Sequence, residues 1–223
     1  MLLALDTSTT SASVALFDGR RVLAEQSWQA ERRQTADLFP AIEGLLALSR
    51  IDLHAVDRIA VATGPGSFTG LRAGIAAAQG LARGRGAAVV GIPTLDVLAY
   101  AHAACGRPAC ALLPAGRTEW YAAFYDSRDG TWARRNDISL RTLEMLCDEI
   151  TTDTLFTGEI DAVAETTLRD VLGSKARFAP PASRLRRAGF LAELGWRELE
   201  AGGATAPSDV EPLYVRAPAI RIS

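Results

Sequence analysis

One stretch of the chain joins a rigid glycine turn to the start of a helix: Gly64-Pro65-Gly66-Ser67-Phe68-Thr69-Gly70-Leu71-Arg72. Such a junction can direct backbone N–H groups at an anion, or it can let the helix pack closely on a neighbour. The stretch lacks the Gly-Lys-Ser/Thr ending of a P-loop, which disfavours a nucleotide site of that type. Ser67 is expected to cap the helix, because no histidine lies nearby in sequence to activate it as a nucleophile.

A second candidate lies where the first apolar run, Leu2–Leu5, ends at Asp6 and continues into Thr7, Ser8 and Thr9. The carboxylate can hold a metal ion there, and the hydroxyls and amides can hold phosphate. The alternative is that Asp6 caps a turn through local backbone hydrogen bonds. An apolar strand that ends in this way resembles the start of the phosphate loop in the actin, hexokinase and Hsp70 superfamily.

A self-sufficient phosphotransferase of that superfamily needs a second strand ending in a carboxylate and a later glycine pair that holds adenosine. The apolar segment 110–113 ends instead in Pro114, which offers neither charge nor an N–H group to a phosphate. Segment 155–159 contains a single glycine. Independent phosphotransfer is therefore not expected, and the Asp6–Thr9 turn is interpreted either as a capped turn or as a vestigial phosphate loop.

Metal chemistry is disfavoured by the histidines and cysteines. His54 and His102 are the only histidines, and they fall in different predicted elements without an i, i+4 spacing. The three cysteines, Cys105, Cys110 and Cys147, form no zinc-type pair, and their odd number suits a reducing compartment. We expect neither a metal site nor a catalytic residue.

The formal net charge of −2 gives the chain no cationic excess with which to hold a nucleic acid unaided. The small basic clusters Arg32-Arg33 and Arg184/Arg186/Arg187 are predicted to be solvated, with a minor contact to tRNA as the alternative. The N-terminus reads as a first strand, and no apolar run approaches the length of a membrane helix, about 18 residues. A cytoplasmic protein without a membrane contact is expected.

The hydrophobic periodicity predicts a β-β-β-α-β-α-β-α unit, in which the first three strands form an antiparallel meander with a type I′ turn at Asp18-Gly19. Its expected strands are 2–5, 13–17, 22–28, 59–62 and 87–92, and its helices are 35–49, 67–84 and 94–103. Thr35 is the expected N-cap of the first helix. In helix 67–84, Gly70, Gly74 and Ala77 form a bare stripe that permits close approach by another helix or strand.

The segment Cys105–Pro108 combines Gly and Pro between two ordered patterns and predicts a boundary, so that residues 1–105 form one lobe and 106–223 a second, reduced lobe. The second lobe is expected to hold strands at 110–113, 121–125 and 155–157, a turn at Asp129-Gly130, helices at 140–149 and 190–200, and an ordered tail at 211–216. The C-terminal helix and tail could pack back on the first lobe.

Three motifs together resemble the TsaB (YeaZ) family: Leu5-Asp6-Thr7-Ser8-Thr9, the Gly64–Arg72 stretch, and Glu211-Pro212-Leu213-Tyr214-Val215-Arg216. The resemblance implies a two-lobe α/β fold of the actin-like (ASKHA) superfamily with a reduced second lobe. It also implies a bacterial subunit of the machinery that makes N6-threonylcarbamoyladenosine next to the anticodon of tRNAs that read codons beginning with A. In that machinery TsaD transfers the threonylcarbamoyl group, TsaE is an ATPase, and the TsaB member is a non-catalytic paralogue of TsaD.

The resemblance further implies that helices 35–49 and 67–84 bind TsaD, or a second copy of the chain through the same surface. TsaE and, through the complex, tRNA are the other implied partners. No cofactor is expected, and a nucleotide at the partner interface stays open. The implied interface and glycine-loop residues are Thr35, Leu38, Ile42, Gly64, Pro65, Gly66, Ser67, Phe68, Thr69, Gly70, Leu71, Arg72, Gly74, Ala77 and Ala78.

The chain departs from the family pattern at two places. Gln34-Thr35 stands where the family often has His-Ser, and Pro114-Ala115-Gly116 stands where it often has Asp-Ala-Arg. The second change weakens any nucleotide or metal role in the second lobe. The alternative functions are a stand-alone ATP-dependent small-molecule kinase or ATPase, and a peptidase.

Overall fold

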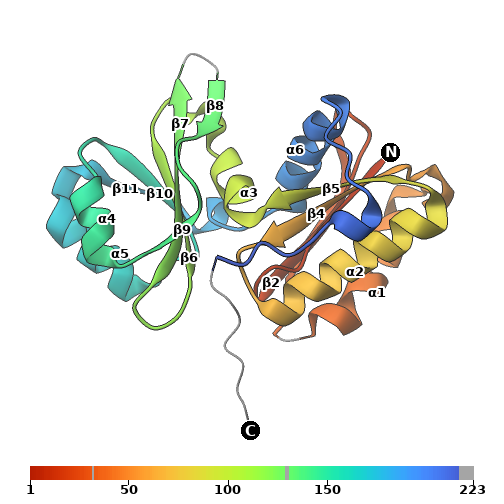
Figure 1. Ribbon diagram of the computed structural model, residues 1–223, viewed down its shortest axis with the longest axis horizontal. Helices are drawn as coiled ribbons and strands as arrows, with labels where there is room; N and C mark the ends of the chain where they lie inside the picture. The colour runs from red at the N-terminus through yellow and green to blue at the C-terminus, as the bar shows by residue number, and fades with distance from the viewer. Residues whose placement is uncertain (32, 129–130, 216–223) are drawn as a thin grey trace, which may run out of the picture. The chain divides into compact units, whose positions relative to one another are not determined.

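Two sheets organise the chain in the structure, a computed structural model that describes residues 1–31, 33–128 and 131–215 (Figure 1). Among the described residues, the first unit contains Met1–Val97 and Arg186–Val215, and the second contains Leu98–Leu185. This division differs from the predicted lobes 1–105 and 106–223. The C-terminal helix belongs to the first unit because its apolar residues pack on that unit's sheet.

Unit 1 contains a five-stranded sheet in the order β3-β2-β1-β4-β5. Strands β1, β2 and β3 form the predicted antiparallel meander, whereas β4 and β5 run parallel to β1. The loop between β2 and β3 holds four residues, 18–21, so the predicted two-residue type I′ turn is wrong. The elements are β1 (Leu2–Asp6), β2 (Ser11–Phe17), β3 (Val22–Gln29), α1 (Gln34–Ser49), β4 (Arg58–Gly64), α2 (Phe68–Arg85), β5 (Ala88–Pro93), α3 (Thr94–Tyr100, which crosses the boundary between the units) and α6 (Ala188–Glu200), with short 3-10 turns at Leu53–Ala55 and Pro207–Asp209.

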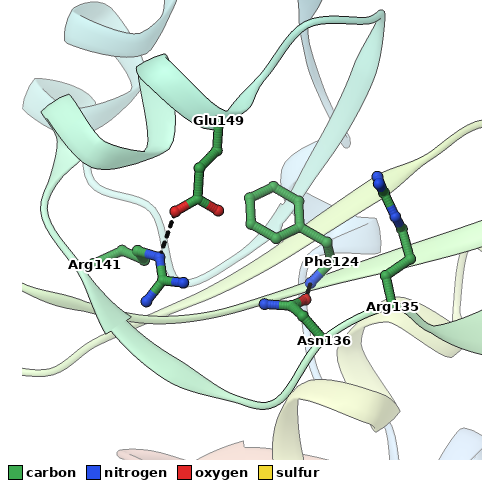
Figure 2. A pocket seen from close by; sticks show the side chains of 5 residues that line it. All are labelled: Phe124, Arg135, Asn136, Arg141 and Glu149. Carbon is green, nitrogen blue, oxygen red and sulfur yellow. Dashed lines mark hydrogen bonds and ion pairs between the residues drawn. The ribbon is translucent and has the colours of Figure 1, made fainter.

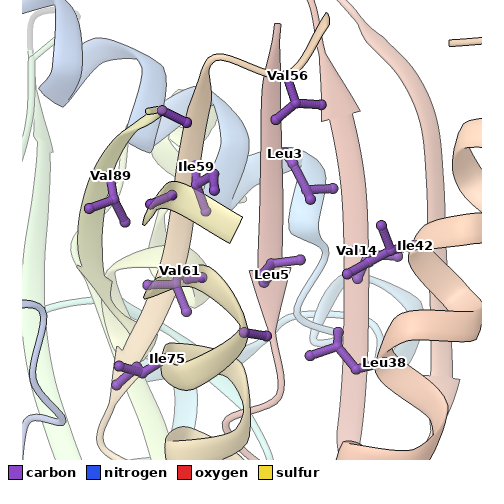
Figure 3. Packing of buried hydrophobic residues seen from close by; sticks show 14 of the residues in the cluster. Leu3, Leu5, Val14, Leu38, Ile42, Val56, Ile59, Val61, Ile75 and Val89 are labelled. Carbon is purple, nitrogen blue, oxygen red and sulfur yellow. The ribbon is translucent and has the colours of Figure 1, made fainter. Parts of the chain in front are cut away.

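The central strands are buried on both faces, and successive side chains alternate between two apolar layers. Leu3, Leu5 and Val61 belong to one buried cluster with Leu38 and Ile42 of α1 and Ile75 of α2 (Figure 3). Leu2, Ala4 and Ala60 point to the opposite face, which α6 covers with Leu191 and its neighbours. The continuous apolar sequence of β1 follows from this two-sided burial, which fixes the register of its C-terminal residue, Asp6.

The two helices of the first layer begin differently. Ser67 caps α2 as predicted, since its hydroxyl oxygen accepts a hydrogen bond from the N–H of Gly70 at 3.3 Å. Helix α1 begins at Gln34, and its N-cap position is Arg33, which provides no side-chain cap. The prediction of Thr35 as N-cap is therefore wrong, and Pro40 lies inside the helix.

Unit 2 contains a sheet in the order β11-β10-β6-β7-β8, with β9 paired to β7. Its core lies between β6, β7 and β10 and the helices α4 and α5. The predicted turn at Asp129-Gly130 lies outside the described residues. The elements are β6 (Ala109–Pro114), β7 (Trp120–Arg128), β8 (Thr131–Arg134), β9 (Ser139–Arg141), α4 (Leu143–Glu149), β10 (Thr154–Gly158), α5 (Ala162–Leu172) and β11 (Ala176–Phe178), with 3-10 turns at Ala103–Cys105, Gly173–Lys175 and Pro181–Ser183.

Candidate functional site

The three sequence motifs meet at one end of the unit 1 sheet. The N–H of Ser67 in the glycine loop donates to the carbonyl of Ser8 in the turn after β1 at 2.6 Å. The N–H of Leu213 in the C-terminal motif donates to the carbonyl of Thr63 at the end of β4 at 2.7 Å. Residues separated by most of the chain therefore form a single cluster, of which Arg216 alone falls outside the described residues.

Both carboxylate oxygens of Asp6 are engaged inside this cluster. Oδ1 accepts hydrogen bonds from the N–H of Ser8 at 2.9 Å and from the Ser8 hydroxyl at 2.6 Å. Oδ2 accepts a hydrogen bond from Nε of Arg186 at 3.0 Å. The Asp6 side chain is fully buried, so it acts as an intramolecular turn cap and ion-pair partner.

Arg186 extends the network across the whole turn. Its Nη2 donates to the Thr9 hydroxyl and, at 2.8 Å, to the carbonyl of Ser11. The residue is 3% exposed, so the prediction that the basic cluster is solvated is wrong for Arg186, whereas Arg187 beside it is exposed. Gln34, one of the departures from the family pattern, adds a bond from its side-chain amide to the carbonyl of Thr9 at 3.0 Å.

A metal-bound nucleotide, which the actin-like fold implies, does not fit this turn. A hard cation needs several free oxygen ligands, but the Asp6 carboxylate already carries three hydrogen-bond donors, one of them cationic. Among the residues that the structure describes, no group of three His, Cys, Asp or Glu side chains gathers where it could hold a metal ion. In the Gly64–Arg72 stretch, the N–H of Ser67 donates to the carbonyl of Ser8 and the N–H of Gly70 donates to the Ser67 hydroxyl, so neither is available to a phosphate.

The glycines of the loop and of α2 permit contact with the turn after β1. A Cβ atom on Gly66 would lie 2.0 Å from the carbonyl oxygen of Ser8, and one on Gly70 would lie 2.1 Å from that of Thr7. On Gly74 it would lie 2.4 Å from the Thr7 hydroxyl oxygen. The bare stripe of Gly70, Gly74 and Ala77 therefore packs inside unit 1, which corrects its assignment to a partner surface.

The interface residues implied by the resemblance fall into buried and exposed sets. Residues that are buried in unit 1 cannot contact a partner. They are Leu38, Ile42, Gly64, Pro65, Gly70, Leu71, Gly74, Ala77 and Ala78. Gly66 is half-buried. The exposed ones are Thr35, Ser67, Phe68, Thr69 and Arg72.

The outer face of α1 and α2 consists of exposed residues, of which only Arg72 belongs to the implied set, and we call it the α1–α2 face. Leu48 is 78% exposed and Phe39 is 48% exposed, although both are large and apolar. Between them and on α2, Gly44, Gly80 and Gly84 leave open space, because nothing lies within 4 Å of a Cβ built on any of them. The face consists of Ala36, Phe39, Pro40, Glu43, Gly44, Ala47, Leu48, Arg72, Ala76, Gly80, Arg83 and Gly84.

An aromatic cluster borders the α1–α2 face at the start of α2. The rings of Phe68 and Tyr214 stack with centroids 5.8 Å apart, and the Arg72 guanidinium lies 4.0 Å from the Phe68 ring centroid. Nε of Arg72 also donates to the Tyr214 hydroxyl at 3.3 Å. Beside the cluster, α2 and the C-terminal segment enclose a groove of about 510 Å³, lined by Arg72, Ile75, Ala76, Gln79, Ser208, Val210, Glu211, Pro212 and Tyr214.

Unit 2 contains a cavity of about 310 Å³ with two arginines at its wall (Figure 2). Nε of Arg141 donates to Glu149 at 2.6 Å, and Arg135 pairs with Asp126 at 3.3 Å. The Asn136 side-chain oxygen accepts from the N–H of Phe124 at 2.9 Å. Because each charged group already has a partner of opposite charge, this cavity has no surplus charge with which to hold an anion.

The two histidines do not supply a peptidase-type metal pair. His54 lies in the exposed 3-10 turn of unit 1, whereas His102 belongs to unit 2 and hydrogen-bonds the Thr157 hydroxyl oxygen at 3.0 Å through Nε2. Burial lowers the pKa of His102, which favours its neutral form.

Comparison of the sequence with models of known protein families identifies one family that matches most of the chain. The family model described as "TsaD: tRNA N6-adenosine threonylcarbamoyltransferase" matches residues 27–222. The tRNA threonylcarbamoyladenosine biosynthesis protein TsaB of Haemophilus influenzae is 45% identical over 101 residues, which are 45% of this chain and 42% of that protein. The chain thus matches less than half the length of that relative. TsaB of Bacillus subtilis is 29% identical over 90% of this chain and 88% of its own length.

Solved structures support the predicted actin-like fold. YeaZ from Pseudomonas aeruginosa is 27% identical with a TM-score of 0.78, and the match covers 96% of this chain and 98% of that one. The ROK hexokinase from Thermus thermophilus shares the fold at 13% identity, with a TM-score of 0.55 over 90% of this chain and 99% of that one. No helix within the described ranges is both long and apolar enough to cross a membrane.

Proposed function

The chain belongs to the TsaD family of tRNA N6-adenosine threonylcarbamoyltransferases, and from that premise we propose that it is a non-catalytic subunit of the machinery that makes N6-threonylcarbamoyladenosine in tRNA. The names of its TsaB relatives support the pathway. Its role is to bind and activate a catalytic TsaD subunit, with TsaE and tRNA joining through the complex.

The absence of catalysis rests on the chemistry of the Asp6 turn. The carboxylate that would hold a metal ion is capped by Ser8 and paired with Arg186. A general acid or base must reach the reacting group, and a fully buried, fully bonded carboxylate does not. No cofactor is therefore assigned to this chain.

The exposed apolar surface of the α1–α2 face is the observation that carries the binding role. Leu48 and Phe39 both lie on α1, whose opposite side already fills the core of unit 1, so their exposure serves no intramolecular packing. Exposed apolar patches on soluble domains commonly mark interaction sites. The open glycines on both helices let a partner helix approach closely.

The charges on this face indicate its partner's chemistry. Arg72 and Arg83 stand at its α2 side, and Glu43 is its acidic member. A partner with an apolar centre and an acidic rim would complement it, and a stable interface would bury roughly 1,200–2,000 Å² in total. We assign TsaD as that partner, and a second copy of the chain binds the same face when TsaD is absent.

A stand-alone kinase and a peptidase are the alternatives. The kinase is disfavoured because the Asp6 carboxylate is already paired with Arg186. A histidine-metal peptidase is disfavoured because His54 and His102 lie in different units. Incubation of the purified chain with labelled ATP and small-molecule acceptors, or with peptides, separates these functions. Turnover in the absence of TsaD would contradict the proposed role.

Nucleoside analysis of tRNA tests the pathway. Cells depleted of the chain should lose N6-threonylcarbamoyladenosine, and re-expression of the chain should restore it. Unchanged levels after depletion would overturn the proposal.

A further inference from the structure

Arg186 reaches the turn after β1 from a position 180 residues further along the chain. Its side chain is 2% exposed and meets three different oxygen atoms: a carboxylate oxygen of Asp6, the hydroxyl oxygen of Thr9 and the carbonyl oxygen of Ser11. A buried guanidinium is tolerated only when it is paired and hydrogen-bonded. The turn supplies both conditions.

Carboxylate, hydroxyl and carbonyl oxygens are also the ligand types that a hard metal cation takes. We propose that Arg186 is the resident cation of this turn, so that its guanidinium permanently occupies the place where the actin-like fold would put a metal ion. The turn is then a site for a guanidinium, and it is closed to a metal-bound nucleotide. This assignment goes beyond the proposed function and does not depend on it.

The geometry favours arginine in particular. Nε and Nη2 of Arg186 point to separate acceptors from one planar group, with Asp6 on one side and Thr9 and Ser11 on the other. A lysine ammonium is a compact point charge and could not span these positions. Removal of the arginine side chain therefore leaves a buried anionic cavity that matches a small guanidinium ion.

Chemical rescue tests the assignment. The thermal unfolding midpoint of Arg186→Ala is measured with millimolar ethylguanidinium chloride and, for comparison, with tetramethylammonium chloride at equal ionic strength. Arg187→Ala is the matched control, because Arg187 is the adjacent, exposed arginine and pairs with Glu25. We expect a lowered midpoint for Arg186→Ala that ethylguanidinium raises in a saturable way. Tetramethylammonium should not raise the midpoint of Arg186→Ala, and ethylguanidinium should not raise the midpoint of Arg187→Ala.

Absence of a specific rise in a folded Arg186→Ala variant, or an equal rise in Arg187→Ala, would overturn the assignment. If Arg186→Ala fails to fold, the unmodified chain provides the test through arginine side-chain NMR. The Nε–H signal of Arg186 should exchange slowly with solvent and should stay unchanged when Mg²⁺ and ATP are added together. Exchange as fast as that of exposed arginines, or displacement of the signal by Mg²⁺ and ATP, would contradict a resident cation.

Discussion

Gly74 of α2 faces Thr7 of the turn after β1 so closely that a Cβ atom on Gly74 would lie 2.4 Å from the Thr7 hydroxyl oxygen. That hydroxyl donates to the carbonyl of Gly70 at 2.7 Å, one turn earlier on the same helix. The small residues at this side of α2 thus allow the helix to approach the turn that holds Asp6. The open side of the helix lies at Ala76, Gly80 and Gly84.

Substitution of the two kinds of helical glycine should have opposite effects. Gly74→Ala should destabilise the chain by about 1–3 kcal/mol, since the new methyl group collides with Thr7 in a packed interior. Gly80→Ala should stabilise it by about 0.5–1 kcal/mol, because the position is exposed and alanine loses less backbone entropy in a helix. Denaturant unfolding of both variants checks this. Equal changes of the same sign in the unfolding free energy would contradict the assignment of Gly74 to the buried side of α2 and of Gly80 to its open side.

The C-terminal motif should depend on its aromatic ring. Tyr214→Ala removes the stack on Phe68 and the contact with Arg72, and such ring pairs contribute about 0.5–1.5 kcal/mol. We expect faster hydrogen exchange at the Leu213 amide, which donates to the carbonyl of Thr63. Tyr214→Phe keeps the ring and should leave that exchange nearly unchanged. Unaltered protection in Tyr214→Ala would mean that the segment is held by other contacts.

Mild acid should weaken unit 2 through His102. Burial lowers the pKa of His102 in the folded chain below its ordinary value of 6.5, and a backbone hydrogen bond to Ser183 opposes this only in part. The unfolded chain therefore binds a proton more readily, so the unfolding free energy should fall as the pH drops from 6.5 toward the lower folded-state pKa.

Unfolding of the unmodified chain and of two variants between pH 7 and pH 5 measures this effect. His102→Gln should flatten the pH dependence, whereas His54→Gln replaces an exposed histidine and should retain it. A slope that persists in His102→Gln would assign the effect to other groups.

Apolar patterning accounts for the part of the fold that the sequence predicted well. The uninterrupted apolar runs 2–5 and 59–62 indicate two strands that are each buried on both faces, as the two apolar layers of unit 1 show. The same logic would have found α5, which was missed. Asp161 caps that helix, and Ala164, Leu168 and Leu172 recur at helical spacing on its buried side.

The site was less accessible to sequence reasoning because its contacts join distant segments. Asp6 and Arg186 share no spacing or periodicity, and an arginine in a basic cluster gives no sign of burial until the fold brings it to the turn. The bare stripe of α2 was recognised, but only tertiary packing decides which side of a helix meets its own sheet. That is why Gly74 was assigned to a partner and Gly80 was overlooked.

The affinity of purified chain for purified TsaD from the same organism tests the central claim most directly. Leu48 on α1 and Val163 on α5 are equally suited to substitution, since they are 78% and 75% exposed and neither supports a core. Leu48→Asp places a charge in the α1–α2 face, and Val163→Asp places the same charge on α5 of unit 2, which contributes no residue to that face.

Titration calorimetry with both folded variants should show at least about tenfold weaker binding for Leu48→Asp, which corresponds to the loss of about 1.4 kcal/mol at an interface hot spot. Val163→Asp should bind like the unmodified chain. Unchanged affinity of Leu48→Asp, or an equal loss in both variants, would contradict docking through the α1–α2 face.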